Sequence, residues 1–297
     1  MSRANEYLPI DGNPADDLVI PMTDDQRERL DLSERFIPGP GGAPDVRVLV
    51  YRPKGAAETL PVLLHLHGGA FCFMHPENFA GMEAGFALDL RCVVVSVDYR
   101  LAPAHPFPAG PEDCYAALLW TVASAVELGI DPGRLVVTGG SAGGALSAAL
   151  CLMTRDRGGP KIAYQGLMMP VLDDRLHQPS HKQAETSEGF SGTAAIGMWL
   201  HYLGEDYDRE QTSPYAAPAR AHDLTGLPPT FIQTNGLDPL RDEGVEFALR
   251  LMAEGIDVEL YNAPGTYHGA DPLDPRTAAQ AYRVYGEALG AALQRGG

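Results

Sequence analysis

Residues 134–144 read RLVVTGGSAGG, an apolar, β-branched run that ends in glycines on both sides of one serine. Such a run is typical of a buried strand, and the glycines indicate a sharp turn into a helix. The pattern G-x-S-x-G matches the nucleophile elbow, in which a serine projects from a tight turn toward a base. Amide groups at the start of the helix can hold a developing oxyanion. We therefore interpret Ser141 as a candidate nucleophile and Ala142 as a candidate oxyanion donor.

The same glycines could instead form a flexible loop or a phosphate-binding loop. A phosphate loop requires a lysine after its last glycine, and Ala145 stands there instead. The five-residue motif by itself leaves a plain glycine loop open. The interpretation therefore depends on the rest of the chain.

Length and composition restrict the class of protein. The chain has 297 residues, of which 45% are hydrophobic, enough for a large core in one α/β domain with an added element. Its net charge of −17, from 22 basic and 39 acidic residues, argues against nucleic acid or an anionic membrane as a partner. The N-terminus lacks a signal-peptide pattern, and no apolar run is long enough to span a bilayer. We therefore expect a cytoplasmic protein without a membrane partner.

Strands and helices alternate along most of the chain, which predicts a mostly parallel central sheet flanked by helices. The expected strands are residues 46–51, 61–67, 92–98, 135–138, 229–234 and 257–261, and the expected helices are residues 111–128, 142–153 and 275–293. A further short helix is expected after Thr23, through Leu32. The four cysteines lack metal-ligand spacing, so we expect buried free thiols.

A glycine-containing loop, HGGAF, follows the strand predicted over residues 61–67. Gly68 and Gly69 let the backbone turn its amides inward, as an oxyanion hole built from a loop requires. The HGGG-type loop of lipases and esterases has this role. His65 and His67 share a strand face and could be metal ligands, but no third ligand stands nearby. We expect no metal, and a structural or loop-orienting role for His67.

Chain order predicts the other two catalytic residues, because α/β-hydrolases place serine first, then the acid, then histidine. Asp238 follows the strand predicted over residues 229–234, where its carboxylate could reach a histidine. Asp242 and Glu243 are rivals, but they fall in the first turn of the next helix, where acidic residues are common. His268 is the only histidine after Asp238. We favour Ser141, Asp238 and His268 as the triad.

Together, these motifs resemble the hormone-sensitive-lipase-like family of bacterial α/β-hydrolase carboxylesterases, and the resemblance covers most of the chain. The matching stretches are HGGAF at 67–71, DYRLAP at 98–103, GGSAGG at 139–144, GLPP at 226–229, DPLRDEG at 238–244 and HG at 268–269. Four positions depart from the family pattern: Gly140, Ala70, Ala104 and Ala270 stand where aspartate, glycine, glutamate and phenylalanine are usual. None of them removes a candidate catalytic group.

The resemblance implies an α/β-hydrolase fold with a helical cap. Residues 1–40 are expected to form the N-terminal part of the cap, and residues 41–297 the catalytic domain, with a cap insertion at about 175–212. Apolar side chains around Trp199 could fold over the site there, although an ordinary core helix explains Trp199 equally well. The resemblance also implies a homodimer and a preference for short to medium acyl chains.

The sequence thus predicts a serine carboxylesterase that acts on a small ester without a cofactor or metal. Ser141 attacks, His268 accepts the proton, Asp238 orients His268, and the amides of Gly68, Gly69 and Ala142 hold the oxyanion. An amidase, formamidase or thioesterase would use the same residues. A non-catalytic binding protein on the same fold is a further alternative, but such proteins usually lack a triad member.

Overall fold

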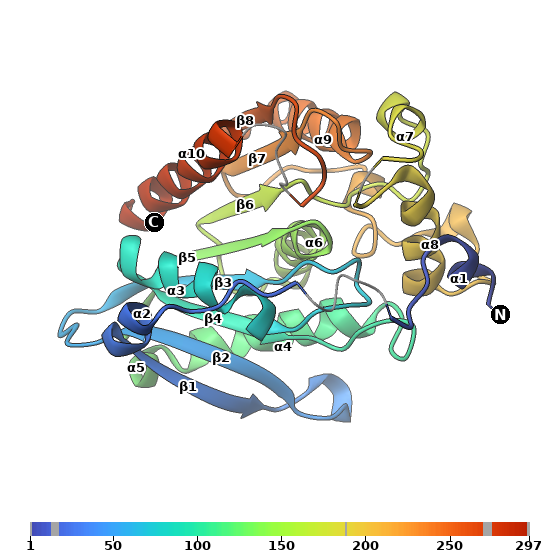
Figure 1. The fold of residues 1–297 in the computed structure, drawn as a ribbon. Helices are drawn as coiled ribbons and strands as arrows, with labels where there is room; N and C mark the ends of the chain where they lie inside the picture. Colours follow the sequence, from blue (N-terminus) through green and yellow to red (C-terminus); the bar gives the residue numbers. More distant parts are fainter. Residues whose placement is uncertain (1, 13–17, 188, 270–274, 296–297) are drawn as a thin grey trace.

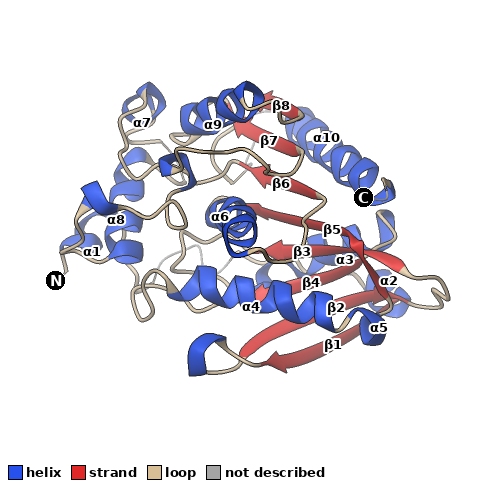
Figure 2. Ribbon diagram, turned by 180° about the vertical axis from the view of Figure 1, so that it is seen from behind, coloured by secondary structure: helices blue, strands red, loops and turns tan. Residues whose placement is uncertain are grey.

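The computed structural model describes residues 2–12, 18–187, 189–269 and 275–295. Within them, the chain is built on an eight-stranded sheet of order β1-β2-β4-β3-β5-β6-β7-β8 (Figures 1 and 2). The strands are β1 (Leu30–Ile37), β2 (Val46–Pro53), β3 (Leu60–Leu66), β4 (Val93–Asp98), β5 (Ile130–Gly140), β6 (Tyr164–Met168), β7 (Thr230–Asn235) and β8 (Val258–Ala263). Only the pairs that β2 makes with β1 and β4 are antiparallel, so the predicted, mostly parallel sheet is confirmed.

Helices cover both faces of the sheet (Figures 1 and 2). They are α1 (Arg3–Tyr7), α2 (Asp24–Arg29), α3 (Ala80–Asp89), α4 (Ala109–Ala123), α5 (Ala125–Leu128), α6 (Ala142–Arg157), α7 (Pro179–Gln183), α8 (Gly192–Leu203), α9 (Arg241–Ala253) and α10 (Pro275–Gln294). Helices α4, α6 and α9 pack on one face, and α3 and α10 on the other. Burial on both faces explains why the central strands are continuous apolar runs.

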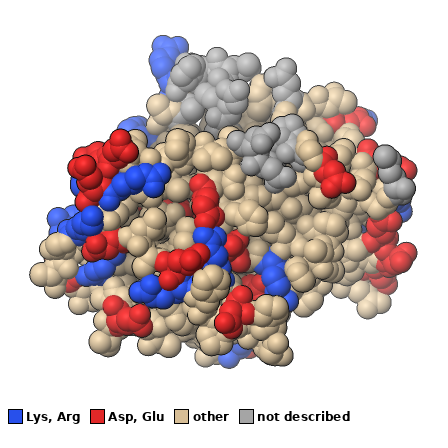
Figure 3. Space-filling view, turned by 60° about the horizontal axis from the view of Figure 1, so that its bottom comes forward, with Lys and Arg blue, Asp and Glu red and all other residues tan. Residues whose placement is uncertain are grey.

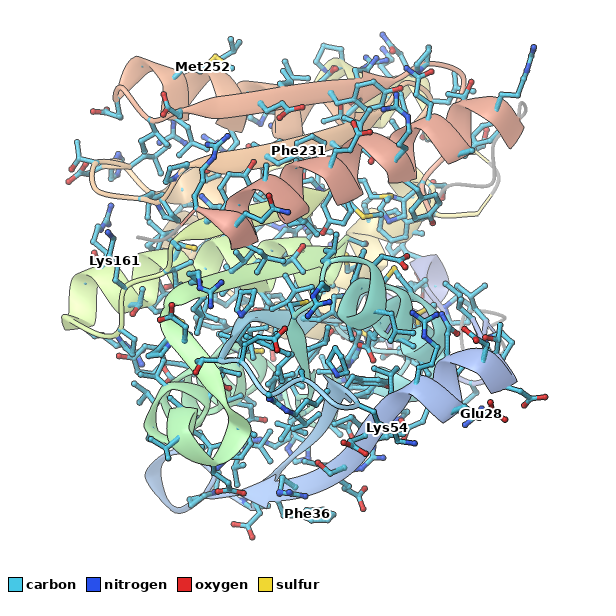
Figure 4. All side chains as sticks on the ribbon, turned by 90° about the vertical axis from the view of Figure 1, so that its left-hand side faces the viewer. Glu28, Phe36, Lys54, Lys161, Phe231 and Met252 are labelled. Carbon is cyan, nitrogen blue, oxygen red and sulfur yellow. The ribbon has the colours of Figure 1, made fainter. Side chains whose placement is uncertain are left out.

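Strand β3 illustrates how the two cores are built. Its alternate side chains point to opposite faces, so Leu64 joins the core under α4 and α6 while Leu63 joins the core under α3 and α10. Phe231 of β7 is fully buried in that second core, 5.6 Å from the ring of Tyr285. Figure 4 shows Phe231 between the sheet and α10, whereas Phe36 projects outward from the edge strand β1.

The N-terminal segment corrects one expectation. Thr23 caps α2 through a capping box, but the helix ends at Arg29 instead of continuing to Leu32. Residues 30–37 then form β1, an outer strand of the sheet, so this part of the expected N-terminal cap belongs to the sheet. Within β1 only Leu30 and Ile37 are buried. The apolar alternation that marks a strand is therefore weak there.

Helix α1 lies at the other end of the molecule, packed on α8 (Figure 1). The two segments approach closely: a Cβ added to Gly197 would lie 2.5 Å from the Cβ of Leu8. The imidazole of His201 also lies 2.9 Å from the carbonyl oxygen of Leu8. Thus the part of the 1–40 segment that packs on the predicted cap insertion includes residues 3–8.

The described part of the surface carries mixed charge. On the face shown in Figure 3, basic side chains lie among acidic ones. Arg47, for example, is paired with the carboxylates of Glu34, Glu77 and Asp98. Among the described helices, none is long and apolar enough to cross a membrane. All four cysteines are buried and free, as predicted.

Candidate active site

Ser141 stands alone between the last residue of β5 and the first residue of α6, in a strained backbone conformation. Its φ of 56° and ψ of −118° lie in a region that non-glycine residues rarely adopt. Two main-chain bonds hold the turn: its amide donates to the carbonyl of Met168 at 2.9 Å, and its carbonyl accepts from the amide of Val171 at 3.1 Å. The predicted elbow is therefore present, and β6 and the loop after it support it.

Neighbouring glycines make this turn possible. A Cβ on Gly143 would lie 1.9 Å from the carbonyl oxygen of Leu66, and one on Gly139 would lie 2.5 Å from the carbonyl carbon of Gly143. A Cβ on Gly140 would meet the Cβ of Met168 at 3.8 Å, an ordinary contact. The fold thus requires glycine at 139 and 143, whereas position 140 has room for a side chain.

We expect Gly143→Ala to lower the free energy of unfolding by about 3 kcal/mol or more, because the methyl group collides with rigid backbone. The matched variant Gly140→Ala is expected to stay within about 1 kcal/mol of the parent. Urea unfolding followed by circular dichroism measures both. Equal stability of the two variants would show that the elbow relaxes around a methyl group at 143.

A continuous line of hydrogen bonds joins the three predicted triad residues. The Nε2 atom of His268 lies 2.8 Å from Oγ of Ser141, and its Nδ1 atom lies 2.7 Å from Oδ2 of Asp238. The other carboxylate oxygen of Asp238 accepts from the amide of Leu240 at 2.8 Å. Asp238 is buried, so its carboxylate interacts mainly with these two donors. The structure therefore brings together Ser141, His268 and Asp238, from three different loops.

The two rival carboxylates point elsewhere. Asp242 accepts from the amide of Ser180 in α7 at 2.8 Å and from the guanidinium of Arg241 at 2.7 Å. Glu243 accepts from the amide of Leu172 at 2.6 Å. Among the described residues, neither carboxylate has a hydrogen bond to a side chain of the triad.

The loop after β3 lies beside the serine. An ideal Cβ built on Gly68 is 3.7 Å from the Cβ of Ser141. Gly69 has φ of 107°, and a Cβ there would lie 2.2 Å from the carbonyl oxygen of Phe73, so only glycine fits. Within the described ranges, the amides of Gly68 and Gly69 have no hydrogen-bond partner. Ala70 has φ of 54°, so the loop keeps a glycine-like conformation despite its alanine.

His67 orients this loop from inside the protein. It is fully buried, and burial lowers its pKa to about 4, so the imidazole is neutral at pH 7. Its Nδ1 lies 2.7 Å from the carbonyl oxygen of Gly68, to which the neutral ring donates a hydrogen bond. The ring also stacks on Tyr99, whose hydroxyl donates to the carbonyl of His67. These contacts support the loop-orienting role expected for His67.

His65 and His67 face the same side of β3, yet each contacts protein groups. Nδ1 of His65 lies 2.7 Å from the carboxylate of Glu83 in α3, which also accepts from the hydroxyl of Ser96. In the parts of the chain that the structure describes, no three metal-binding side chains cluster. The arrangement fits a buried polar pair that joins β3 to α3.

Aromatic side chains of the segment expected to form the cap insertion lie beside the site. The ring of Phe190 lies 4.8 Å from the imidazole of His268. Tyr202 of α8 stacks on Phe71 of the oxyanion loop at 3.8 Å, and Trp199 lies 6.2 Å from the same ring. Trp199 is fully buried. It is therefore both a core residue and a contact between α8 and the active-site loop. Of the family departures, Ala270 lies outside the described residues.

Glu243 has a structural role that the sequence reasoning missed, since it treated this residue only as a rival acid. Its buried carboxylate holds the loop after β6 through the amides of Leu172 and Asp173. The other carboxylate oxygen lies 3.4 Å from Nε2 of His181 in α7. Burial raises the pKa of Glu243 to about 7, against the opposing effect of His181 and the amide of Leu172. Its position after DPLRD, at the start of a helix, gave no signal for this role.

We expect the raised pKa of Glu243 to make stability depend on pH. Between its ordinary pKa of 4.5 and about 7, the folded chain keeps a proton that the unfolded chain has released. Stability therefore falls as pH rises through this window. In Glu243→Gln this pH dependence is absent. As the pH rises from about 5 to about 8, the free energy of unfolding of the variant should therefore increase by up to about 3 kcal/mol relative to that of the parent. Urea unfolding at several pH values measures the difference, and parallel curves would contradict the prediction.

The parallel sheet, the serine at the strand-to-helix turn, and the aligned histidine and aspartate define an α/β-hydrolase. The family model described as the alpha/beta hydrolase fold matches residues 63–271, and the chain belongs to that family.

Several relatives are named esterases. Carboxylesterase NlhH of Mycobacterium tuberculosis is 40% identical over 242 residues, which are 81% of this chain and 75% of that protein. The arylesterase of Saccharolobus solfataricus is 33% identical over 77% of this chain and 74% of its own length. Among solved structures, a bacterial heroin esterase has 42% identity and a TM-score of 0.87, covering 90% of this chain and 86% of that one. The predicted resemblance to hormone-sensitive-lipase-like esterases is thus confirmed.

Proposed function

We propose that this protein is a serine carboxylesterase that hydrolyses small esters with short to medium acyl chains. The observation that carries the proposal is the hydrogen-bonded line from Ser141 through His268 to Asp238. The similarity to proteins named carboxylesterase, arylesterase and heroin esterase supports an ester as the substrate.

In the first half of the reaction, Oγ of Ser141 attacks the ester carbonyl carbon while Nε2 of His268 takes the hydroxyl proton. Asp238 accepts the Nδ1 hydrogen bond and stabilises the imidazolium. The negative charge that develops on the carbonyl oxygen is held by the amides of Gly68, Gly69 and Ala142. When the tetrahedral intermediate collapses, the bond to the alcohol breaks and His268 protonates the leaving oxygen. An acyl group then remains on Ser141.

In the second half, His268 takes a proton from water, and the resulting hydroxide attacks the acyl carbon. The new tetrahedral intermediate releases the carboxylic acid and returns the proton from His268 to Ser141. The N-terminus of α6 adds a favourable dipole to the oxyanion site. In a protease site of this type, the loss of one oxyanion donor costs about 3 to 4 kcal/mol.

Rates on a matched set of ester, thioester and amide substrates test the proposed substrate class. We expect the ester to react fastest, with p-nitrophenyl acetate and butyrate preferred over long acyl chains. A preference for the amide or the thioester would contradict the esterase proposal and favour an amidase, formamidase or thioesterase that uses the same residues. Robust hydrolysis of long, emulsified triglycerides would contradict the predicted chain length.

The cytoplasmic location and the homodimer implied by the resemblance stay predictions. Light scattering of the purified protein tests the dimer, and a monomer contradicts it.

A further inference from the structure

Two buried side chains outside the triad join the loops that carry it. Asn235 is the last residue of β7, and Met169 directly follows β6, the neighbouring strand. The side-chain amide of Asn235 donates to the carbonyl of Tyr267 at 2.7 Å and to the sulfur of Met169 at 3.4 Å. The amide of Gly269 donates to the same sulfur at 3.3 Å. The residues immediately before and after His268 are thus both held by this pair.

The pair is itself fixed to the other two members of the triad. The amide of Met169 donates to the carbonyl of Gln233 in β7 at 2.7 Å, and the preceding carbonyl, of Met168, accepts from the amide of Ser141. The carbonyl of Asn235 accepts from the amide of Asp238 at 3.2 Å. Both side chains are buried, Asn235 completely. Movement of either one would therefore change the position of His268 relative to Ser141 and Asp238.

We propose that Asn235 and Met169 are positioning residues that hold the loop of His268 in register with Ser141 and Asp238. The inference rests on the proposed function of these three residues. The imidazole bonds to Ser141 and Asp238 at 2.8 and 2.7 Å, so a displacement of its backbone by about 1 Å moves at least one partner out of hydrogen-bond range. A misplacement of about 1 Å can cost about 100-fold in rate. A backbone held on both sides of the histidine prevents this.

The first test compares Met169→Leu with Met153→Leu. Leucine keeps most of the buried volume but has no acceptor for the amide of Gly269. Met153 is also a buried methionine, in α6, so its substitution controls for packing. We expect Met169→Leu to lower kcat by about 10-fold with KM nearly unchanged, because transition-state positioning is lost while ester binding is kept. The control should retain the parent kcat.

Asn235→Ala removes the bonds that its side-chain amide donates to Tyr267 and Met169, together with the bond that its Oδ1 accepts from Gln233. We expect it to lower kcat by about 100-fold. The double variant with Met169→Leu should lose less than the product of the two single losses, because both changes release the same loop. A proton NMR signal of the His268 Nδ1–H group, shifted downfield by its bond to Asp238, provides a second readout. It should broaden through exchange in both variants and stay sharp in Met153→Leu.

Parent-like kcat and a sharp proton signal in both Met169→Leu and Asn235→Ala would overturn the inference. A loss of kcat that only follows a lower melting temperature, and occurs equally in Met153→Leu, would show a packing role and overturn it as well. If Asn235→Ala does not fold, Met169→Leu decides. Failure of the proposed function would look different. In that case Ser141→Ala would be as active as the parent, whereas the His268 proton signal would still report whether Asn235 and Met169 position the loop.

Discussion

Replacement of Ser141 by alanine is expected to lower kcat/KM for p-nitrophenyl acetate by about 10⁵-fold or more, because no other group can form the acyl-enzyme. The fold should be unaffected. The serine hydroxyl makes no capping bond to α6, and alanine has the same Cβ at the strained φ of 56°. Initial rates of the purified proteins, with circular dichroism as the check on folding, provide the measurement.

Ser147→Ala is the matched control for this loss. Ser147 is a buried serine of the same helix, and its hydroxyl donates to the carbonyl of Gly143 at 2.8 Å. Its removal should cost about 1 kcal/mol of stability and leave kcat/KM within a few-fold of the parent. Equal hydrolysis by the parent and Ser141→Ala would mean that the reaction does not use the elbow. Inactivity of a folded parent would favour another acyl substrate or a binding role.

The elbow could be predicted from sequence because its requirements are local. A buried strand, a strained serine and small neighbours within five residues leave a recognisable pattern, and contacts such as that of Gly143 with Leu66 explain why the pattern tolerates no larger side chain. The chain order of acid and base then restricted the remaining choices to a few residues. His268 needed no further information, since no other histidine follows Asp238.

Two strands were not predicted, for physical reasons that differ. β1 lies at the sheet edge and buries only the side chains of Leu30 and Ile37, so it lacks the regular alternation of buried apolar and exposed polar residues. β6 is fully central but contains Gly166, where an added Cβ would lie 2.8 Å from Leu289 of α10. Because α10 packs so closely here, β6 has a glycine at a position where a β-branched residue would usually indicate a strand. Neither cause can be read from neighbouring residues.

The choice among three acids, and the contacts of Met169 with Asn235, depend on distant parts of the chain. Asp242 and Glu243 lie in the first turn of α9, as the sequence predicts. Only the fold shows that Asp242 binds α7 and that Glu243 binds the loop after β6. Met169 and Asn235 are 66 residues apart and belong to no motif. Their contact follows from the pairing of β6 with β7, which the sequence did not predict.

Asp238→Asn is expected to lower kcat by about 10⁴-fold, because an amide cannot stabilise the imidazolium and can favour the wrong histidine tautomer. The matched variant Asp242→Asn, in the first turn of α9, loses its ion pair with Arg241 and weakens a bond to α7. It should therefore keep kcat within about 10-fold of the parent. Initial-rate assays with p-nitrophenyl butyrate measure kcat for both variants. A larger loss of kcat in Asp242→Asn than in Asp238→Asn would mean that Asp238 is not the catalytic acid, despite its 2.7 Å contact with His268.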